Sequence, residues 1–88
     1  MEAPLSVTYR NGRPFAAYYR LPRRADDRVD RSRPCEGGLV VDLTADGRPL
    51  GIEITEPREL DVATFNRVLA SLGLDPVDAS MLAPLHAA

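Results

Sequence analysis

The sequence predicts one small α+β domain, in which a four-stranded antiparallel sheet made of two hairpins carries one main helix on one face. Three observations support this fold class. Residues 39–54 alternate apolar and polar on both sides of Asp46-Gly47. Residues 5–21 show a weaker alternation around Asn11-Gly12, and residues 62–72 place apolar side chains at helical spacing. The length of 88 residues is that of a single domain, so one domain is expected over 1–88.

The second hairpin, within residues 39–54, has the most regular pattern. Asp46-Gly47 suits a two-residue turn, because glycine adopts a positive φ at little cost. With that turn, the apolar residues face each other in pairs: Leu43 with Leu50, Val41 with Ile52, and Leu39 with Ile54. All six side chains then fall on one face of the sheet, so the register is self-consistent.

The first hairpin pairs residues 5–9 with residues 15–21. A three-residue loop, often accompanied by a bulge, would place the odd-numbered residues of both strands on one face, whereas a two-residue turn at Asn11-Gly12 would scramble that face. We therefore expect the three-residue loop. Residues 22–36 follow, and with only Val29 and Cys35 as strongly apolar residues they are expected to be a mobile, arginine-rich linker within the 5–54 sheet region.

The sequence predicts a helical tail in the C-terminal part, over residues 61–83. Asp61 is a suitable N-cap for a helix over 62–72, and Gly73 stands where a C-terminal cap needs a positive φ. Asp75-Pro76 then predicts a second short helix, because proline is favoured at the first helical position. Pro84 is expected to end that helix.

Composition excludes several classes of function. The net charge of −2 argues against general binding to nucleic acids or membrane surfaces. A single cysteine allows no internal disulfide, and no apolar run approaches the length of a membrane span, so a cytoplasmic location is expected. The small core that such a chain can build raises the expectation of a homodimer or a small protein partner, with the apolar segment 81–85 adding contacts.

The hairpin motif also resembles a known family. Val41-Asp42, Asp46-Gly47 and Gly51-Ile52-Glu53-Ile54 are similar to a family of small bacterial proteins that is described only as a domain of unknown function. In that family a tyrosine-containing strand pair precedes the hairpin, and here Tyr9 and the segment 17–19 would take this place. The resemblance covers about residues 7–56. It implies a small antiparallel sheet, and it implies no activity, because no catalytic residues are assigned to the family.

Two groups of polar residues are candidates for a site. Tyr18, Asp42 and Glu53 are expected on the open face of the sheet, opposite the apolar row. There they are either solvated positions or a carboxylate pair for a cation or a basic partner. The second group consists of six arginines with a local net charge of +3 after three aspartates are counted: Arg20, Arg23, Arg24, Arg28, Arg31 and Arg33. These form either a solvated mixed-charge loop or a surface for an acidic partner, RNA or another anion.

No constellation for catalysis or for a cofactor emerges. The only cysteine, Cys35, and the only histidine, His86, are far apart in sequence, and no glycine-rich phosphate loop or metal-ligand cluster is present. The sequence therefore favours a non-enzymatic interaction or oligomerisation module over an enzyme. RNA or anion binding through the arginines at 20–33 is the alternative.

Overall fold

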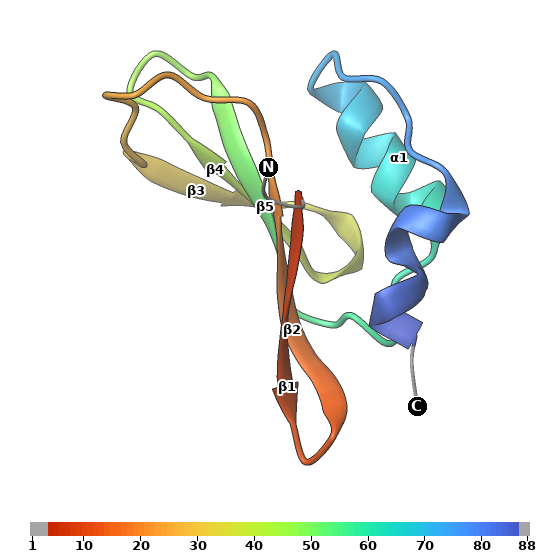
Figure 1. Ribbon diagram of the computed structural model, residues 1–88. Helices are drawn as coiled ribbons and strands as arrows, with labels where there is room; N and C mark the ends of the chain where they lie inside the picture. Colours follow the sequence, from red (N-terminus) through yellow and green to blue (C-terminus); the bar gives the residue numbers. More distant parts are fainter. Residues whose placement is uncertain (1–3, 87–88) are drawn as a thin grey trace.

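One antiparallel sheet of five strands forms the centre of the computed structural model, which describes residues 4–86. The strands are β1 (Leu5–Arg10), β2 (Arg13–Arg20), β3 (Arg31–Pro34), β4 (Leu39–Leu43) and β5 (Pro49–Ile54), and their order in the sheet is β1-β2-β5-β4-β3. Two helices, α1 (Val62–Ser71) and the 3₁₀ helix η2 (Ala79–His86), lie on the same side of the sheet (Figure 1). The α+β class and the antiparallel sheet are confirmed, but the prediction of four strands is wrong.

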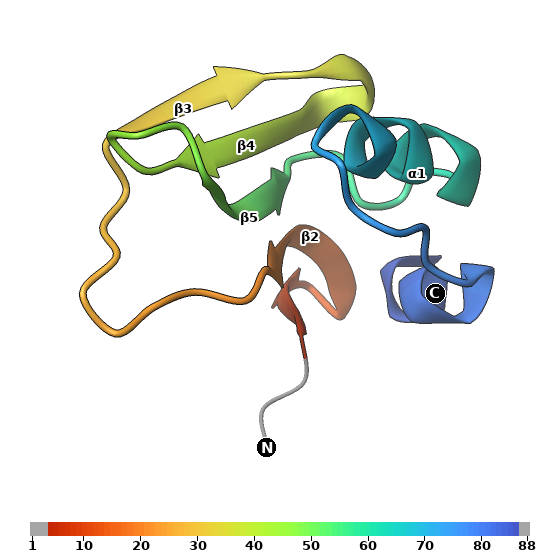
Figure 2. The same cartoon turned by 90° about the horizontal axis from the view of Figure 1, so that it is seen from above.

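The additional strand is β3, which arises from the segment expected to be a linker. It pairs with β4, and the backbone contacts continue at both ends: the Asp30 N–H donates to the Leu43 carbonyl at 2.8 Å, and the Cys35 N–H donates to the Leu39 carbonyl at 2.7 Å. All four β3 side chains are exposed, because the strand lies at the edge of the sheet. An edge strand of this kind buries no apolar row, so hydrophobic alternation could not reveal it. Figure 2 shows β3 at the outer side of β4.

The β4–β5 hairpin keeps the predicted register except at its tip. Val41 lies opposite Ile52, and Leu39 lies opposite Ile54, as expected. Leu43, however, lies opposite Pro49 rather than Leu50, because the register shifts by one residue after Asp42. The expected two-residue turn is wrong, since Thr44 and Arg48 close the loop through their backbones at 2.9 Å. Gly47 has the positive φ (89°) that this three-residue loop requires.

The β1–β2 hairpin differs from the prediction in the opposite direction, because its turn is shorter than expected. Leu5 lies opposite Tyr19, and Val7 lies opposite Ala17, so the odd-numbered residues pair as expected. The turn nevertheless has two residues, Asn11 and Gly12, and both have a positive φ (53° and 76°). A register shift between Thr8 and Tyr9 reconciles this turn with the paired strands, because it leaves Phe15 as an extra residue in β2.

Helix α1 is fixed by its ends. The Asp61 side chain accepts a hydrogen bond from the Thr64 N–H at 2.8 Å, which satisfies one of the free donors at the start of the helix. At the other end Gly73 has a φ of 75°, and the Leu74 N–H donates to the Leu69 carbonyl at 2.9 Å. This is the predicted cap at glycine. The helix has 10 residues, and no longer helix follows it among residues 72–86.

The second helix differs from the prediction in type and place. It is a 3₁₀ helix that begins at Ala79 rather than at Pro76, and it includes Pro84 instead of ending before it. The Asn66 side chain explains the late start: its amide nitrogen donates to the Val77 carbonyl at 3.1 Å, and its oxygen accepts from the Val77 N–H at 2.9 Å. These two bonds take the backbone groups of Val77 away from a helix.

The hydrophobic core lies between the sheet and the two helices. It includes Val41 and Ile52 of the central strands together with Phe65 of α1, all of which have no exposed surface. The Tyr19 ring packs edge-to-face on Phe65, with ring centres 5.1 Å apart and an angle of 87° between the ring planes. Leu82 and Leu85 of η2 complete the core beside β1 and β2 (Figure 2). The opposite face of the sheet carries no helix, and the candidate polar residues lie there.

Candidate functional site

Tyr18, Asp42 and Glu53, which are separated in sequence, lie together on the open face. Tyr18 of β2 is directly opposite Glu53 of β5, and its hydroxyl donates a hydrogen bond to Asp42 Oδ2 of β4 at 3.1 Å. The other carboxylate oxygen of Asp42 accepts a hydrogen bond from Ser32 Oγ of β3 at 2.6 Å. Asp42 is only 6% exposed, so both of these hydrogen bonds compensate for water that its carboxylate has lost.

Gly51 makes this contact possible. It lies opposite Asp42 on β4 and opposite Arg20 on β2, in the path that the Tyr18 ring takes across β5. A Cβ atom added to Gly51 would fall within 2.6 Å of Tyr18 Cε2 and still closer to the hydroxyl end of the ring. Gly51 does not have a positive φ, so the backbone itself does not require glycine there. The Gly-Ile-Glu-Ile strand therefore needs its glycine to let Tyr18 reach Asp42.

One residue of the arginine group joins the open-face cluster. The Arg23 guanidinium donates to the Leu50 carbonyl at 2.8 Å through Nη2, and the same nitrogen lies 3.5 Å from the Tyr18 hydroxyl. Tyr18 thus lies between a cation and the Asp42 carboxylate. We define the open-face cluster as Tyr18, Arg23, Ser32, Asp42 and Glu53.

Burial and neighbouring groups shift the pKa of two side chains in this cluster. Burial raises the pKa of Tyr18, an effect that Arg23 opposes and Asp42 reinforces, so the phenol remains a hydrogen-bond donor at neutral pH. The adjacent Asp42 carboxylate and burial raise the pKa of Glu53. Residues 4–86 contain no group of three or more His, Cys, Asp or Glu side chains that could hold a metal ion.

The remaining arginines of the group do not form one surface. Arg31 and Arg33 lie on β3 opposite Leu43 and Val41, which face the core, so these two arginines project from the helix side of the sheet, whereas Arg23 lies over the open face. Arg24 and Arg28 belong to the irregular connection between β2 and β3, and Arg20 ends β2. Arg31 also contacts Asp30 at 3.4 Å.

An ion pair that the sequence did not suggest anchors the connection between β2 and β3. Arg48 donates two hydrogen bonds to Asp27, at 2.6 and 3.1 Å, and the Asp27 side chain is 4% exposed. The Arg48 guanidinium and the Arg24 N–H lower the pKa of Asp27 from 3.8 to about 2. Sequence reasoning missed this pair because the two residues belong to different segments. It also missed Ser32, because β3 has no apolar alternation to mark it as a strand.

Cys35 and His86 do not form a catalytic pair. Cys35 Sγ lies 3.7 Å from the Arg33 carbonyl, whereas His86 Nε2 lies 2.6 Å from the Leu60 carbonyl. Each side chain thus binds a backbone oxygen in a different part of the chain. Neither is arranged as a nucleophile with an adjacent base.

Comparison with known proteins gives no assignment. Over residues 4–86 no helix has both the length and the apolar character that a membrane crossing requires. The resemblance inferred from the Gly-Ile-Glu-Ile hairpin stays a prediction. No family model matches the chain, and no curated protein and no solved structure matches it significantly.

Proposed function

We propose that the protein is a non-enzymatic interaction module that assembles as a homodimer, with β1 paired to β1 of a second copy in antiparallel orientation. The position of β1 supports this proposal: it is the outermost strand on one side of the sheet and has β2 as its single neighbour in the described chain. Its outward backbone groups are available for a further strand. β1 has six residues, a usual length for strand pairing.

The sequence of β1 suits pairing with itself. In a register centred on Val7, the residue pairs across the two copies are Leu5 with Tyr9, Ser6 with Thr8, and Val7 with Val7. Arg10, the charged residue of this strand, then faces Pro4 of the other copy. No like charges oppose each other in this register, so pairing carries no electrostatic cost.

The opposite edge of the sheet is protected against the same association. β3 has only four residues, and self-pairing centred on Ser32 would place Arg31 opposite Arg33 twice. Pro34 has no N–H group to donate to a neighbouring strand. Charged residues and proline are common means by which natural sheets block an edge. The contrast between the two edges favours β1 as the surface that pairs.

The C-terminal segment does not support the interface that the sequence suggested for it. Leu82 is 1% exposed and Leu85 has no exposed surface, because both side chains pack in the core of their own chain. The two leucines of the segment 81–85 are therefore used within the monomer, and Ala83 and Pro84 are its exposed residues. The proposal rests on the β1 edge and not on the tail.

Two double variants test the proposed pairing. Ser6 and Thr8 are exposed, and in the proposed register they face each other across the two copies. Ser6→Lys with Thr8→Lys places lysine opposite lysine at both positions, so we expect a monomer in sedimentation or light scattering. Ser6→Lys with Thr8→Glu places opposite charges there instead, so we expect the mass to return to twice that of the monomer.

The wild-type protein should show twice the monomer mass at micromolar concentration. Both variants carry changes only at exposed positions of β1, so we expect both to fold. Circular dichroism of both variants checks this. A monomeric wild type would overturn the proposal. Equal dimerisation of the two double variants would exclude the β1 edge as the interface.

The alternative function, RNA or anion binding through the arginines at 20–33, gains no specific support. These arginines project from both faces of the sheet, and Arg23 is already bound to the Leu50 carbonyl. We also propose a cytoplasmic location, which the free thiol of Cys35 supports, because unpaired cysteines are common in reducing compartments.

A further inference from the structure

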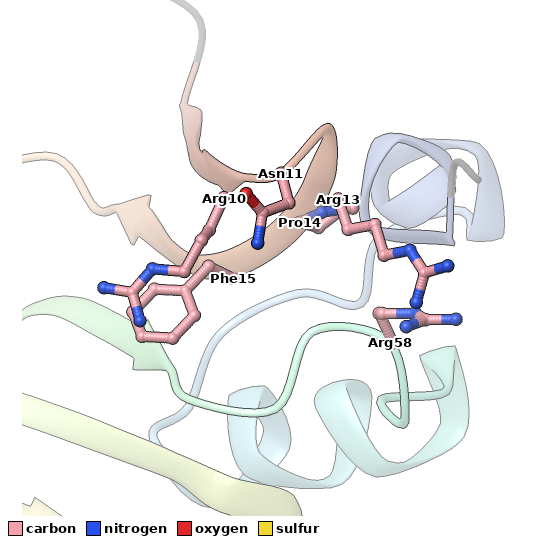
Figure 3. A pocket seen from close by; sticks show the side chains of 6 residues that line it. All are labelled: Arg10, Asn11, Arg13, Pro14, Phe15 and Arg58. Atoms are coloured by element: carbon pink, nitrogen blue, oxygen red, sulfur yellow. The ribbon is translucent and has the colours of Figure 1, made fainter.

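A hollow of about 360 Å³ lies at the tip of the β1–β2 hairpin, on the side where the chain leaves β5 (Figure 3). Its volume is within the range of small-molecule sites, which is about 300–1,000 Å³. The lining comes from two segments that are distant in sequence: the hairpin tip and the turn at residues 57–59. The lining residues are Arg10, Asn11, Arg13, Pro14, Phe15 and Arg58.

The charge of this hollow is of one sign. Arg10, Arg13 and Arg58 contribute three guanidinium groups, and no acidic residue lines the hollow. Within residues 4–86 none of these three arginines forms a salt bridge. A second hollow, beside the Asp27–Arg48 ion pair, has arginines and aspartates in its lining and is therefore internally compensated. The hairpin-tip hollow is the one that lacks a counter-charge.

Two of the three arginines, Arg13 and Arg58, are arranged to approach one anion, whereas the Arg10 guanidinium lies away from them over the Phe15 ring (Figure 3). The side chains of Arg13 and Arg58 come from different segments and bring their guanidinium groups to the same side of the hollow (Figure 3). The Asn11 amide lies between this pair and Arg10 (Figure 3). Guanidinium groups bind phosphate oxygens through two parallel hydrogen bonds, and an amide adds a neutral donor. The geometry suits the oxygens of one phosphate group.

An aromatic wall stands beside the charged groups. Phe15 is 49% exposed although it is a large apolar residue, and the Arg10 guanidinium lies over its ring at 4.0 Å from the ring centre. The bulge in β2 and the positive φ of Asn11 fix this tip, so the Arg10–Phe15 stack is preformed. A flat guanidinium stacked on an aromatic ring offers its other face to a flat ring of a ligand.

We propose that this hollow binds a mononucleotide, with the phosphate between Arg13 and Arg58 and the base stacked on the Arg10–Phe15 pair. The charge selects the phosphate, and the exposed aromatic wall selects a ligand with a flat ring. The volume of about 360 Å³ and the single pair of facing guanidinium groups suit one nucleotide with one phosphate rather than a long nucleic acid chain. It shares Arg10 with the strand whose pairing is proposed above, but Arg13, Phe15 and Arg58, which the test below changes, lie outside β1.

The test is a titration of the full chain with AMP, with orthophosphate and with adenosine, in which binding is measured by NMR chemical shifts or calorimetry. AMP should bind more tightly than orthophosphate, and adenosine should bind more weakly than either. Arg13→Gln and Arg58→Gln should each weaken AMP binding by about tenfold, because each removes a charged donor pair. Phe15→Leu should reduce the preference for AMP over orthophosphate while orthophosphate binding persists.

Arg33→Gln is the matched control, since Arg33 is an exposed arginine of β3 outside the hollow. It should bind AMP as the wild type does. Equal weakening by Arg33→Gln would overturn the site in favour of general attraction of anions. Absence of AMP binding at millimolar concentration, or adenosine binding equal to that of AMP, would also overturn the proposal. Binding of an oligonucleotide without binding of AMP would replace it with a nucleic-acid surface.

Discussion

Gly51→Ala offers the sharpest test of the open-face cluster. The backbone at Gly51 suits any residue, so the only obstacle to a methyl group is the Tyr18 ring, which a new Cβ would approach within 2.6 Å at Cε2. The ring must move, and the hydrogen bond from Tyr18 to Asp42 is then lost. A hydrogen bond to a charged group contributes about 1.5–3 kcal/mol.

The substitution also has a stabilising effect, which offsets part of the free energy lost with the hydrogen bond. Alanine in a strand costs about 0.5–1 kcal/mol less conformational entropy than glycine. The net effect of Gly51→Ala is therefore a loss of about 1–2 kcal/mol in the free energy of unfolding. For a chain of this size each kcal/mol lowers the melting temperature by about 4–8 °C, so thermal denaturation followed by circular dichroism measures it readily.

A double-mutant cycle with Tyr18→Ala isolates the cause. Without the ring, Gly51→Ala should be neutral or should stabilise the fold by up to about 1 kcal/mol. The coupling energy between positions 18 and 51 should then be about 1.5–3 kcal/mol. Tyr18→Phe is the matched control, because it keeps the ring atoms that obstruct a Cβ at position 51 while it removes the hydroxyl. An equal cost of Gly51→Ala with and without Tyr18 would refute the argument.

Three further predictions concern stability. Ile52→Asp should abolish the folded state in circular dichroism, because Ile52 has no exposed surface and an unpaired charge there would cost more than the roughly 5 kcal/mol that stabilises a small domain; a folded variant would place Ile52 on the wrong face. Glu53→Gln should raise the melting temperature at neutral pH. Asp42 and burial raise the pKa of Glu53 in the folded state, so the folded state binds the carboxyl proton of Glu53 more tightly than the unfolded chain does. The stability of the wild type therefore falls as pH rises through this pKa. The advantage of Glu53→Gln should vanish below the usual pKa of 4.5, and an advantage that is independent of pH would contradict the explanation. Asp27→Asn should destabilise the fold at neutral pH and reduce the loss of stability in acid. The pKa of Asp27 is about 2 in the folded state and 3.8 as the usual value, so the contribution of its ion pair to stability is present above pH 3.8 and is lost as pH falls toward 2. Identical acid denaturation of the wild type and the variant would exclude a role for the Arg48 ion pair.

The sequence determined the parts of the fold in which local chemistry and burial agree. A slip of one residue between β4 and β5 would turn the apolar row of one strand to the open face, so the alternation excludes it, and Val41 indeed lies opposite Ile52. The capping of α1 by Asp61 and Gly73 was readable because a cap is a contact within a few residues. The same reasoning placed Tyr18, Asp42 and Glu53 on one face, since strands alternate their side chains.

Only the tertiary structure decided the features that depend on residues distant in the chain. Both hairpin tips differ from the prediction by one residue, because a bulge can reconcile either turn length with a register that burial has fixed. Strand β3 pairs through its backbone and buries no side chain, so no apolar pattern marks it. The late start of η2 depends on Asn66 binding Val77, and the charged hollow depends on Arg58 meeting Arg13. Local sequence encodes turns, caps and faces, whereas contacts between separate segments exist only once the chain has folded.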